Sequence, residues 1–159
     1  MELEFDVKVT TASLYDYMLR HIYTKLQGIL ATMTGVLIII GFMITGYPIY
    51  LIAGIIIIAY LPWTFYLKAK QQVLNTPAFK EPLHYKLTEE GIEVSQNGET
   101  QKQVWEAMVK AVSTRESIIV YTSAVNASIF PRKDMKDLTP AVIQMISTHM
   151  SREKVKIRG

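Results

Sequence analysis

Residues that could do chemistry are few in this sequence, and none shows a spacing typical of a catalytic or metal-binding motif. The three histidines, His21, His84 and His149, are far apart, and none belongs to a His-Glu-x-x-His pair of zinc ligands. The chain has no cysteine, which excludes disulfides, thiolate metal sites and thiol nucleophiles. P-loop and Gly-x-Ser-x-Gly motifs are also absent. We therefore predict no catalytic residue, no metal site and no cofactor, and expect the protein not to be an enzyme.

Clusters of positive charge are the sequence feature most typical of a binding surface. Three such residues follow a predicted strand, namely Arg132, Lys133 and Lys136, and four more lie near the C-terminus, namely Arg152, Lys154, Lys156 and Arg158. Such cations bind anionic lipid headgroups, at about 1 kcal/mol for each cation near the surface, or carboxylates of a protein partner. The alternatives are a solvated loop for the first group and a frayed end for the second.

The charge balance helps to narrow the class of partner. A formal net charge of +3 is mild, and most positive residues are scattered, so a nucleic-acid partner gains little support. No feature of the sequence suggests a small-molecule substrate. We expect a lipid bilayer as one partner, and a protein or a second copy of the chain as the other.

A long apolar block separates the charged parts of the chain. From Leu26 to Leu67 there is no Asp, Glu, Lys, Arg or His, and this length suffices for two membrane spans of roughly 20 residues each. We place the spans near 28–45 and 49–67. A buried hairpin in a soluble core is the alternative, but so small a fold has too few other elements to cover two such apolar helices.

Several residues of this block and of the later strands are predicted to be structural. Gly46 and Pro48 suit the turn between the spans, because Gly ends a helix readily and Pro begins one. Pro62 is expected to kink the second span. Asn97 and Gly98 form the strongest hairpin signal of the chain. Trp105, flanked by polar residues, is predicted to fill the core of a sheet rather than to stack on a ligand.

Charges at the ends of the apolar block predict its orientation. Arg20 and Lys25 precede the first span, Lys68 and Lys70 follow the second, and the turn carries no charge. By the positive-inside rule, both termini are expected in the cytoplasm. The chain then divides into an N-terminal strand and amphipathic helix (1–25), a transmembrane hairpin (26–67) and a cytoplasmic β-sheet domain with a C-terminal helix (68–159).

Period-two and period-four patterns predict the elements outside the hairpin. Residues 3–9 alternate as in a strand, and a helix capped by Ser13 and Asp16 is expected to continue into the first span. Further strands are predicted at 83–88, 91–96, 101–113 (bent or bulged), 117–122 and 127–130. A last helix is predicted to begin near Thr139. We expect the first strand to join the later sheet, which makes the hairpin an insertion in one domain.

Four segments of the chain resemble the YcxB-like family of bacterial membrane proteins. They are residues 83–92 (Leu-His-Tyr-Lys-Leu-Thr-Glu-Glu-Gly-Ile), 104–110 (Val-Trp-Glu-Ala-Met-Val-Lys), 118–121 (Ile-Ile-Val-Tyr) and 129–133 (Ile-Phe-Pro-Arg-Lys). The resemblance implies a pair of spans, a C-terminal domain similar to the pleckstrin-homology fold, and a bacterial inner-membrane location. It implies no activity. We thus expect an α+β membrane protein: a two-helix transmembrane hairpin inserted in a small cytoplasmic pleckstrin-homology-like antiparallel β-sheet domain closed by a C-terminal helix.

Three functional hypotheses follow from these observations. The leading one is a non-enzymatic, membrane-anchored interaction or regulatory module at the cytoplasmic face of the bacterial inner membrane. The second is a self-protection (immunity) or stress protein, whose hairpin intercepts membrane-active peptides. The third, which has the least support, is an unrecognised enzyme.

Overall fold

The chain of this computed structural model leaves its β-sheet domain after one strand and one helix, and returns to it only after two long apolar helices. The structure describes residues 2–124 and 126–158. Two units are formed: residues 1–17 with 73–159, and residues 18–72. The α+β class expected from the sequence is confirmed.

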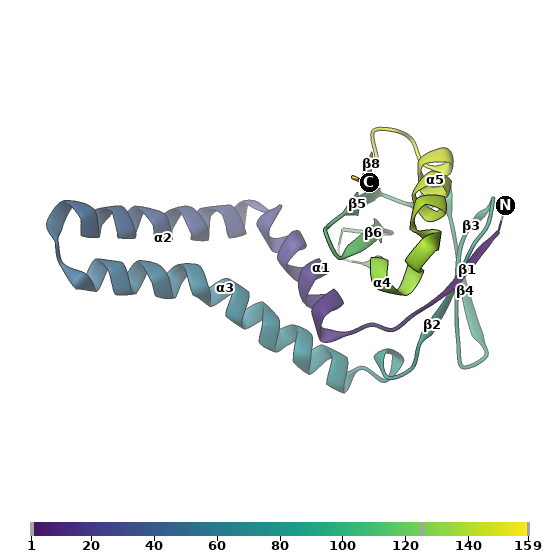
Figure 1. Ribbon diagram of the computed structural model, residues 1–159, viewed down its shortest axis with the longest axis horizontal. Helices are drawn as coiled ribbons and strands as arrows, with labels where there is room; N and C mark the ends of the chain where they lie inside the picture. Colours follow the sequence, from purple (N-terminus) through teal and green to yellow (C-terminus); the bar gives the residue numbers. More distant parts are fainter. Residues whose placement is uncertain (1, 125, 159) are drawn as a thin grey trace. The chain divides into compact units, whose positions relative to one another are not determined.

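Helices α2 (Leu26–Thr45) and α3 (Pro48–Asn75) form the hairpin and run side by side in opposite directions (Figure 1). Both are long and apolar enough to cross a membrane. Gly46 ends α2 in the left-handed conformation, with φ of 73°, and its N–H donates to the Phe42 carbonyl at 2.8 Å. Pro48 then occupies the first position of α3, where its missing N–H is not needed.

The two helices of the hairpin approach each other closely at a pair of glycines, Gly35 and Gly54. A methyl group added to Gly54 would lie 2.8 Å from the Gly35 carbonyl oxygen and 2.5 Å from Cγ1 of Ile39. One added to Gly35 would lie 2.5 Å from Cγ1 of Ile58. Small residues at both positions therefore allow the backbones to pack closely. Pro62 lies inside α3, and the ribbon of this helix bends along its course (Figure 1).

Helix α1 (Thr11–Tyr23) does not continue into the first apolar helix, and that prediction was wrong. Its last carbonyls are satisfied locally: the Thr24 hydroxyl donates to the Arg20 and His21 carbonyls at 3.0 Å each. Lys25 then adopts an extended conformation, with φ of −98° and ψ of 151°. The chain is thereby redirected before α2 begins.

The predicted cap of α1 was also wrong. Thr10 caps the helix, because its backbone N–H donates to Ser13 Oγ at 2.9 Å while the Ser13 N–H donates to Thr10 Oγ1 at 3.3 Å. Asp16 instead accepts a 2.6 Å hydrogen bond from the Thr114 hydroxyl. The carboxylate therefore ties α1 to the loop before β6 rather than capping its own helix.

The first sheet contains four antiparallel strands in chain order: β1 (Leu3–Val7), β2 (Leu83–Leu87), β3 (Gly91–Gln96) and β4 (Glu99–Val104). The pairing of β1 with β2 confirms that the N-terminal strand joins the later sheet. The strand ends at Val7 rather than residue 9, although Val9 is still buried. Asn97 and Gly98 join β3 to β4, with φ of 51° and 84°.

The second sheet has the order β7-β6-β5-β8, from strands β5 (Lys110–Ser113), β6 (Ser117–Tyr121), β7 (Ala127–Pro131) and β8 (Val155–Lys156). The single bent strand predicted at 101–113 was wrong. The 3-10 turn η2 (Trp105–Ala107) divides it, so that β4 and β5 belong to different sheets. Strand β8, parallel to β5, was not predicted.

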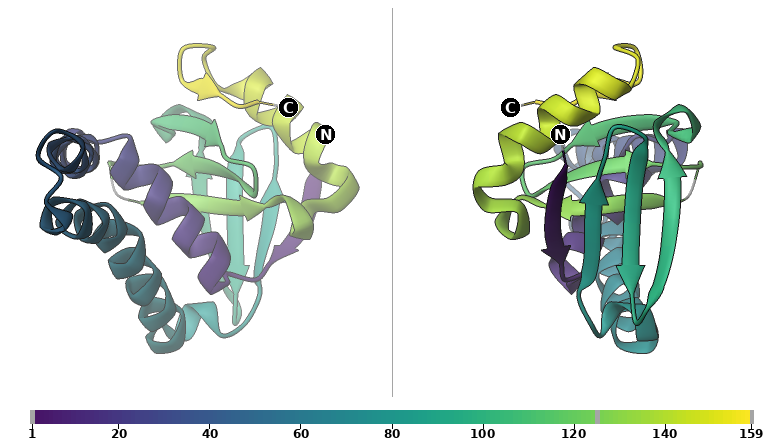
Figure 2. Two further views of the ribbon diagram at one scale, coloured as in Figure 1. Left: turned by 60° about the vertical axis from the view of Figure 1, so that its left-hand side comes forward. Right: turned by 90° about the vertical axis from the view of Figure 1, so that its right-hand side faces the viewer.

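Short helical elements complete the domain: η1 (Pro77–Phe79), α4 (Arg132–Met135), η3 (Lys136–Leu138) and α5 (Thr139–His149). The strands of the two sheets cross at a steep angle, with α5 beside them (Figure 2). Apolar side chains from both sheets and from α5 share one core. Within it, the Tyr85 and Phe130 rings lie 4.9 Å apart edge to face, and Phe5 packs on both.

Strand β6 is buried on both faces, which explains its uninterrupted apolar sequence. Ile118 and Val120 belong to the main core, whereas Ile119 and Tyr121 face the other way. On that second side the Tyr17 ring of α1 lies 5.9 Å from the ring of Tyr121. The N-terminal half of α1 therefore covers the outer face of the second sheet.

Candidate functional site

A surface groove of about 630 Å³ lies where the end of β1 meets α4 and η3. Lys133 and Lys136, both predicted as contact residues, line it together with Lys8, which the sequence did not single out. Among the described residues, none of these three ammonium groups makes a salt bridge. The groove therefore presents three available cations from segments far apart in the sequence.

Carboxylates on the same rim balance these cations. Asp6, Asp134 and Asp137 also line the groove. Asp134 is held by the β1 end, because the Lys8 backbone N–H donates to its Oδ2 at 3.2 Å. Asp6 lies 2.8 Å from His84 Nδ1. The groove thus offers alternating charges, which suits a polar protein surface better than a uniformly anionic ligand.

Lys136 carries backbone strain at this groove. Its φ of 50° and ψ of −122° are unusual for a residue with a side chain. The Thr139 hydroxyl donates to the Lys136 carbonyl at 2.9 Å and helps to hold this conformation. The change of direction from α4 to η3 depends on it, and so does the position of Lys136 on the groove rim.

Arg132 does not line the groove with its two predicted neighbours. Its Nη2 donates to the Arg158 carbonyl at 2.8 Å, and its Nε is buried with no hydrogen-bond partner among the described residues. The side chain therefore holds the C-terminal segment. Sequence analysis grouped Arg132 with Lys133 and Lys136 because they are neighbours in the chain, but Arg132 does not line the same surface as the two lysines.

The four basic residues of the C-terminus lie apart from the groove, and the segment from Lys154 to Arg158 runs along the second sheet. Lys154 Nζ donates to the Met108 carbonyl at 2.9 Å, and the Ala111 N–H donates to the Lys154 carbonyl at 2.8 Å. The Arg158 N–H donates to the Ser113 hydroxyl at 2.8 Å. The tail is thus held as an edge of the sheet, and the alternative of a frayed end was wrong. Arg152 and Lys156 are exposed.

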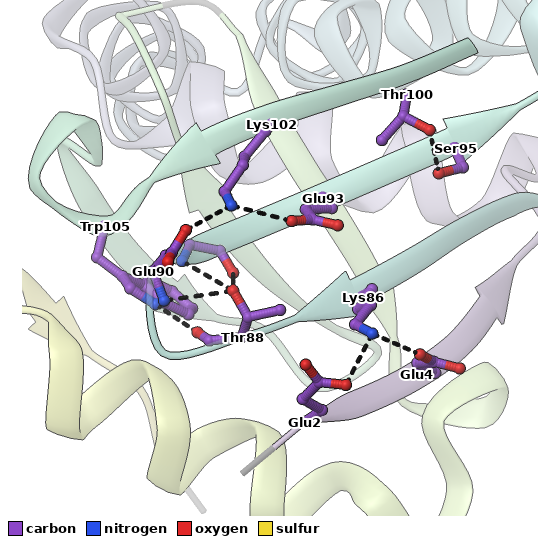
Figure 3. A network of polar contacts seen from close by, with 11 residues as sticks. Glu2, Glu4, Lys86, Thr88, Glu90, Glu93, Ser95, Thr100, Lys102 and Trp105 are labelled. Carbon is purple, nitrogen blue, oxygen red and sulfur yellow. Dashed lines mark hydrogen bonds and ion pairs between the residues drawn. The ribbon is translucent and has the colours of Figure 1, made fainter.

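The outer face of the first sheet carries a row of alternating charges across all four strands. Glu4, Lys86, Glu93 and Lys102 are successive cross-strand neighbours. Lys86 Nζ lies 3.2 Å from Glu4, and Lys102 Nζ lies 3.2 Å from Glu93 (Figure 3). Hydrogen bonding to Glu2 and Glu4 raises the pKa of Lys86.

The row ends at β4, whose outer edge has no strand partner among the described residues. Lys102 also lies 2.6 Å from Glu90, and hydrogen bonding to Glu90 and Glu93 raises its pKa. Beside it, the Ser95 and Thr100 hydroxyls lie 2.9 Å apart (Figure 3). The face is therefore polar, and its charges are paired within the sheet.

Trp105 lies in the core and only 4 % of it is exposed. Its indole N–H donates to the Thr88 carbonyl at 2.9 Å, and its ring stacks on His149 with centroids 5.5 Å apart. His149 Nε2 in turn lies 2.8 Å from Glu89. This chain of contacts joins α5 to the β2–β3 turn and leaves no open ring face for a ligand.

No group of three or more potential metal ligands comes together among the residues that the structure describes. His21 lies on α1, His84 on β2 and His149 at the end of α5. The features left to consider as candidates are surfaces: the charged groove, the exposed strand β4 and the apolar hairpin.

The fold defines an α+β protein in which a two-sheet domain is interrupted by two long apolar helices. Residues 87–146 match the model of a protein family described as YcxB-like protein, which confirms the resemblance predicted from the sequence. The matched segment begins at the last residue of β2 and ends within α5. No curated protein and no solved structure matches the chain.

Proposed function

We propose that this chain is a non-enzymatic interaction module anchored in the bacterial inner membrane by two spans, with both termini and the β-sheet domain in the cytoplasm. Helices α2 and α3 are the anchor in this proposal. The β-sheet domain, which we propose to be pleckstrin-homology-like, binds a protein partner at the membrane surface.

The distribution of exposed apolar side chains carries the anchoring part of the proposal. Among the described residues, every large apolar side chain that is exposed lies between Leu26 and Leu74, except Val104 and Val109. The β-sheet domain, by contrast, buries its apolar residues in a common core. A continuous apolar surface of this extent needs an apolar environment, which a bilayer supplies.

Polar groups within the hairpin support the same conclusion. The hydroxyls of Thr32, Thr34, Thr45 and Thr64 each donate to the carbonyl four residues earlier, at 2.6 to 2.9 Å. In hydrocarbon, a hydroxyl without a partner is costly, and this local bond removes the cost. Polar residues in these helices therefore do not oppose insertion.

Two features support an interaction role for the β-sheet domain. The groove at Lys8, Lys133 and Lys136 offers unpaired cations beside carboxylates, as a polar protein interface does. Two crossed sheets, antiparallel except for the β5–β8 pair, together with a C-terminal helix support the pleckstrin-homology-like arrangement that the family resemblance implies. Both features lie in the unit outside the hairpin.

Single cysteines test the topology, because the natural chain has none. Tyr47→Cys places a thiol in the turn of the hairpin, and Glu106→Cys places one on the exposed surface of the β-sheet domain. We expect a membrane-impermeant maleimide to label Tyr47→Cys in intact cells and Glu106→Cys only after the membrane is opened. Labelling of Glu106→Cys in intact cells, or recovery of the protein in the soluble fraction, would contradict the proposal.

Site-specific crosslinking tests the interaction role. A photo-crosslinking residue at Lys133 lies on the groove, whereas the same residue at Thr148 lies on an exposed position of α5 outside it. We expect a discrete crosslinked protein from position 133 that is lost in the Lys8→Glu/Lys136→Glu variant. Equal products from both positions, or none from position 133, would contradict a partner at the groove.

A further inference from the structure

Strand β4 is the part of the β-sheet domain that is most open to another chain. It pairs with β3 over its full length, from Gly91 opposite Val104 to Gln96 opposite Glu99, with no bulge. Its second edge has no partner among the described residues, and every β4 residue except Gln103 is exposed. Long, regular edges of this kind readily accept another strand.

The usual protection of such an edge is weakened here. Charged residues on an edge strand normally discourage pairing. β4 has two, Glu99 at its first position and Lys102, and the Lys102 ammonium is already engaged, 2.6 Å from Glu90 and 3.2 Å from Glu93. β4 contains no proline. Val104 lies on this strand and is 47 % exposed; it is one of two exposed large apolar side chains outside the hairpin in the described part of the chain.

We propose that β4 pairs with β4 of a second copy, antiparallel about a two-fold axis, to join the two first sheets into one. This inference rests on the proposed membrane anchoring. A six-residue strand pair is weak by itself, but confinement of both copies to one membrane raises their effective concentration.

Symmetry and charge select one register. Residues opposite each other in an antiparallel pair point to the same face, so the two-fold axis must pass beside a residue and not between two residues. Only axes at Gln101 or Lys102 pair all but one residue of each strand. An axis at Lys102 would place two ammonium groups opposite each other, which is unfavourable.

The Gln101 register is self-complementary. It places Gln101 opposite Gln101, Thr100 opposite Lys102, and Glu99 opposite Gln103. No like charges are opposed. The row of charged residues on the outer face of the first sheet, which ends at Lys102, then meets the same row of the second copy where the two β4 strands pair.

Single-cysteine crosslinking in native membranes tests this register on the full chain. Gln101→Cys would face its own copy with Cβ atoms about 5 Å apart, within reach of a disulfide. Glu99→Cys is the matched control on the same strand, because its copies would be separated by about 13 Å along the strand. Glu4→Cys is the control on the opposite edge, β1.

We expect mild oxidation to give a disulfide-linked dimer with Gln101→Cys and at least about tenfold less with Glu99→Cys or Glu4→Cys. Equal crosslinking of all three variants, or none with Gln101→Cys, would overturn the proposal. A disulfide between Gln101→Cys and a different protein alone would also overturn it, and would assign the edge to a strand of another partner.

A charge exchange separates loss of pairing from misfolding. Gln101→Lys and Gln101→Glu each place like charges at the two-fold axis, and we expect each variant alone to lose about tenfold or more of its dimer. Mixing the two variants should restore it. Failure of the mixture to restore dimer, or dimer retained in both single variants, would refute the register.

Membrane retention of each variant is measured in the same preparations. Variants that stay in the membrane but never dimerise would overturn the β4 inference and leave the anchoring intact. Variants found in the soluble fraction would contradict the anchoring itself.

Discussion

Charged side chains on the outer face of the first sheet are stabilised mainly by neighbours on adjacent strands. The Lys86 ammonium is shared by Glu2 and Glu4, and the Lys102 ammonium by Glu90 and Glu93. Solvent reaches all six groups and screens them, so each pair contributes little to stability. Their main effect is on register, because each pair forms only when the strands are correctly aligned.

The Lys102–Glu90 pair predicts how stability depends on pH. Hydrogen bonding to Lys102 lowers the pKa of Glu90, so its stabilising contribution is present above the ordinary value of 4.5 and is lost as pH falls through the lowered pKa. The raised pKa of Lys102 acts in the opposite sense: its contribution is present below 10.5 and is lost as pH rises through the raised pKa.

The measurement compares the unfolding free energy of wild type and Lys102→Met as a function of pH. We expect a small difference between pH 4.5 and 10.5 that disappears at both extremes. Lys133→Met, which removes a lysine without a salt bridge among the described residues, is the control and should give a difference that does not follow this profile. A difference that persists well below the pKa of Glu90 would contradict the assignment.

Ser113 is a second residue whose removal gives a local effect. It accepts a hydrogen bond from the Arg158 N–H at 2.8 Å and is buried, with 8 % exposed. We expect Ser113→Ala to cost about 1 kcal/mol and to loosen β8 in particular. Loosening of β8 would appear as faster tryptic cleavage after Lys154 and Lys156, with an unchanged cleavage rate elsewhere. Uniformly faster cleavage would point to a global effect instead.

Elements of the hairpin are joined by close packing of backbones rather than by large side chains. Gly35 and Gly54 face each other across α2 and α3, where an added methyl group would meet a carbonyl oxygen of the other helix. Such contacts provide the van der Waals packing that holds helices together in lipid, where no hydrophobic force between them exists.

Gly54→Leu therefore tests the packing of these two elements. We expect it to separate the helices and to cost about 1–3 kcal/mol, seen as a lower midpoint of thermal unfolding in detergent. Gly41→Leu is the matched control on α2, because a methyl group there would meet only the Tyr50 ring at 3.9 Å. Equal effects of both variants would show that the Gly35–Gly54 contact is not special.

At the scale of the whole molecule, the apolar hairpin interrupts a domain whose parts come from both ends of the chain. Leu3, Phe5 and Val7 of β1 are buried in the same core as residues of β2 and α5. Each such side chain stabilises the fold by about 1.5–3 kcal/mol. The β-sheet domain therefore depends on a strand that lies before the hairpin.

This arrangement predicts that residues 73–159 alone do not fold stably, whereas residues 1–17 joined to 73–159 by a flexible linker of sufficient length do. The linked variant should be soluble, because the exposed apolar side chains of the hairpin are removed. Thermal unfolding of both variants is followed by circular dichroism, and a cooperative transition is expected only for the linked variant. A cooperative transition in 73–159 alone would contradict the role of β1.

Local patterns were sufficient to predict most single elements. Alternation of apolar residues in β1, the run of apolar residues from Leu26 to Leu67, and Asn97-Gly98 each determine a backbone conformation through nearby residues alone. The break between α1 and α2 was missed because the apolar periodicity continues through Thr24 and Lys25, and only the structure shows the Thr24 hydroxyl bonds and the extended backbone of Lys25.

Patterns in the amino-acid sequence were enough to predict the α+β class, the apolar hairpin, the absence of cysteine chemistry and the resemblance to the YcxB-like family. Only the folded chain shows that residues 101–113 belong to two sheets, that the C-terminal segment forms β8, and that Lys133 and Lys136 share a groove with Lys8 while Arg132 does not. The physical reason is that these features depend on contacts between residues far apart in the chain, which no local pattern of side chains encodes.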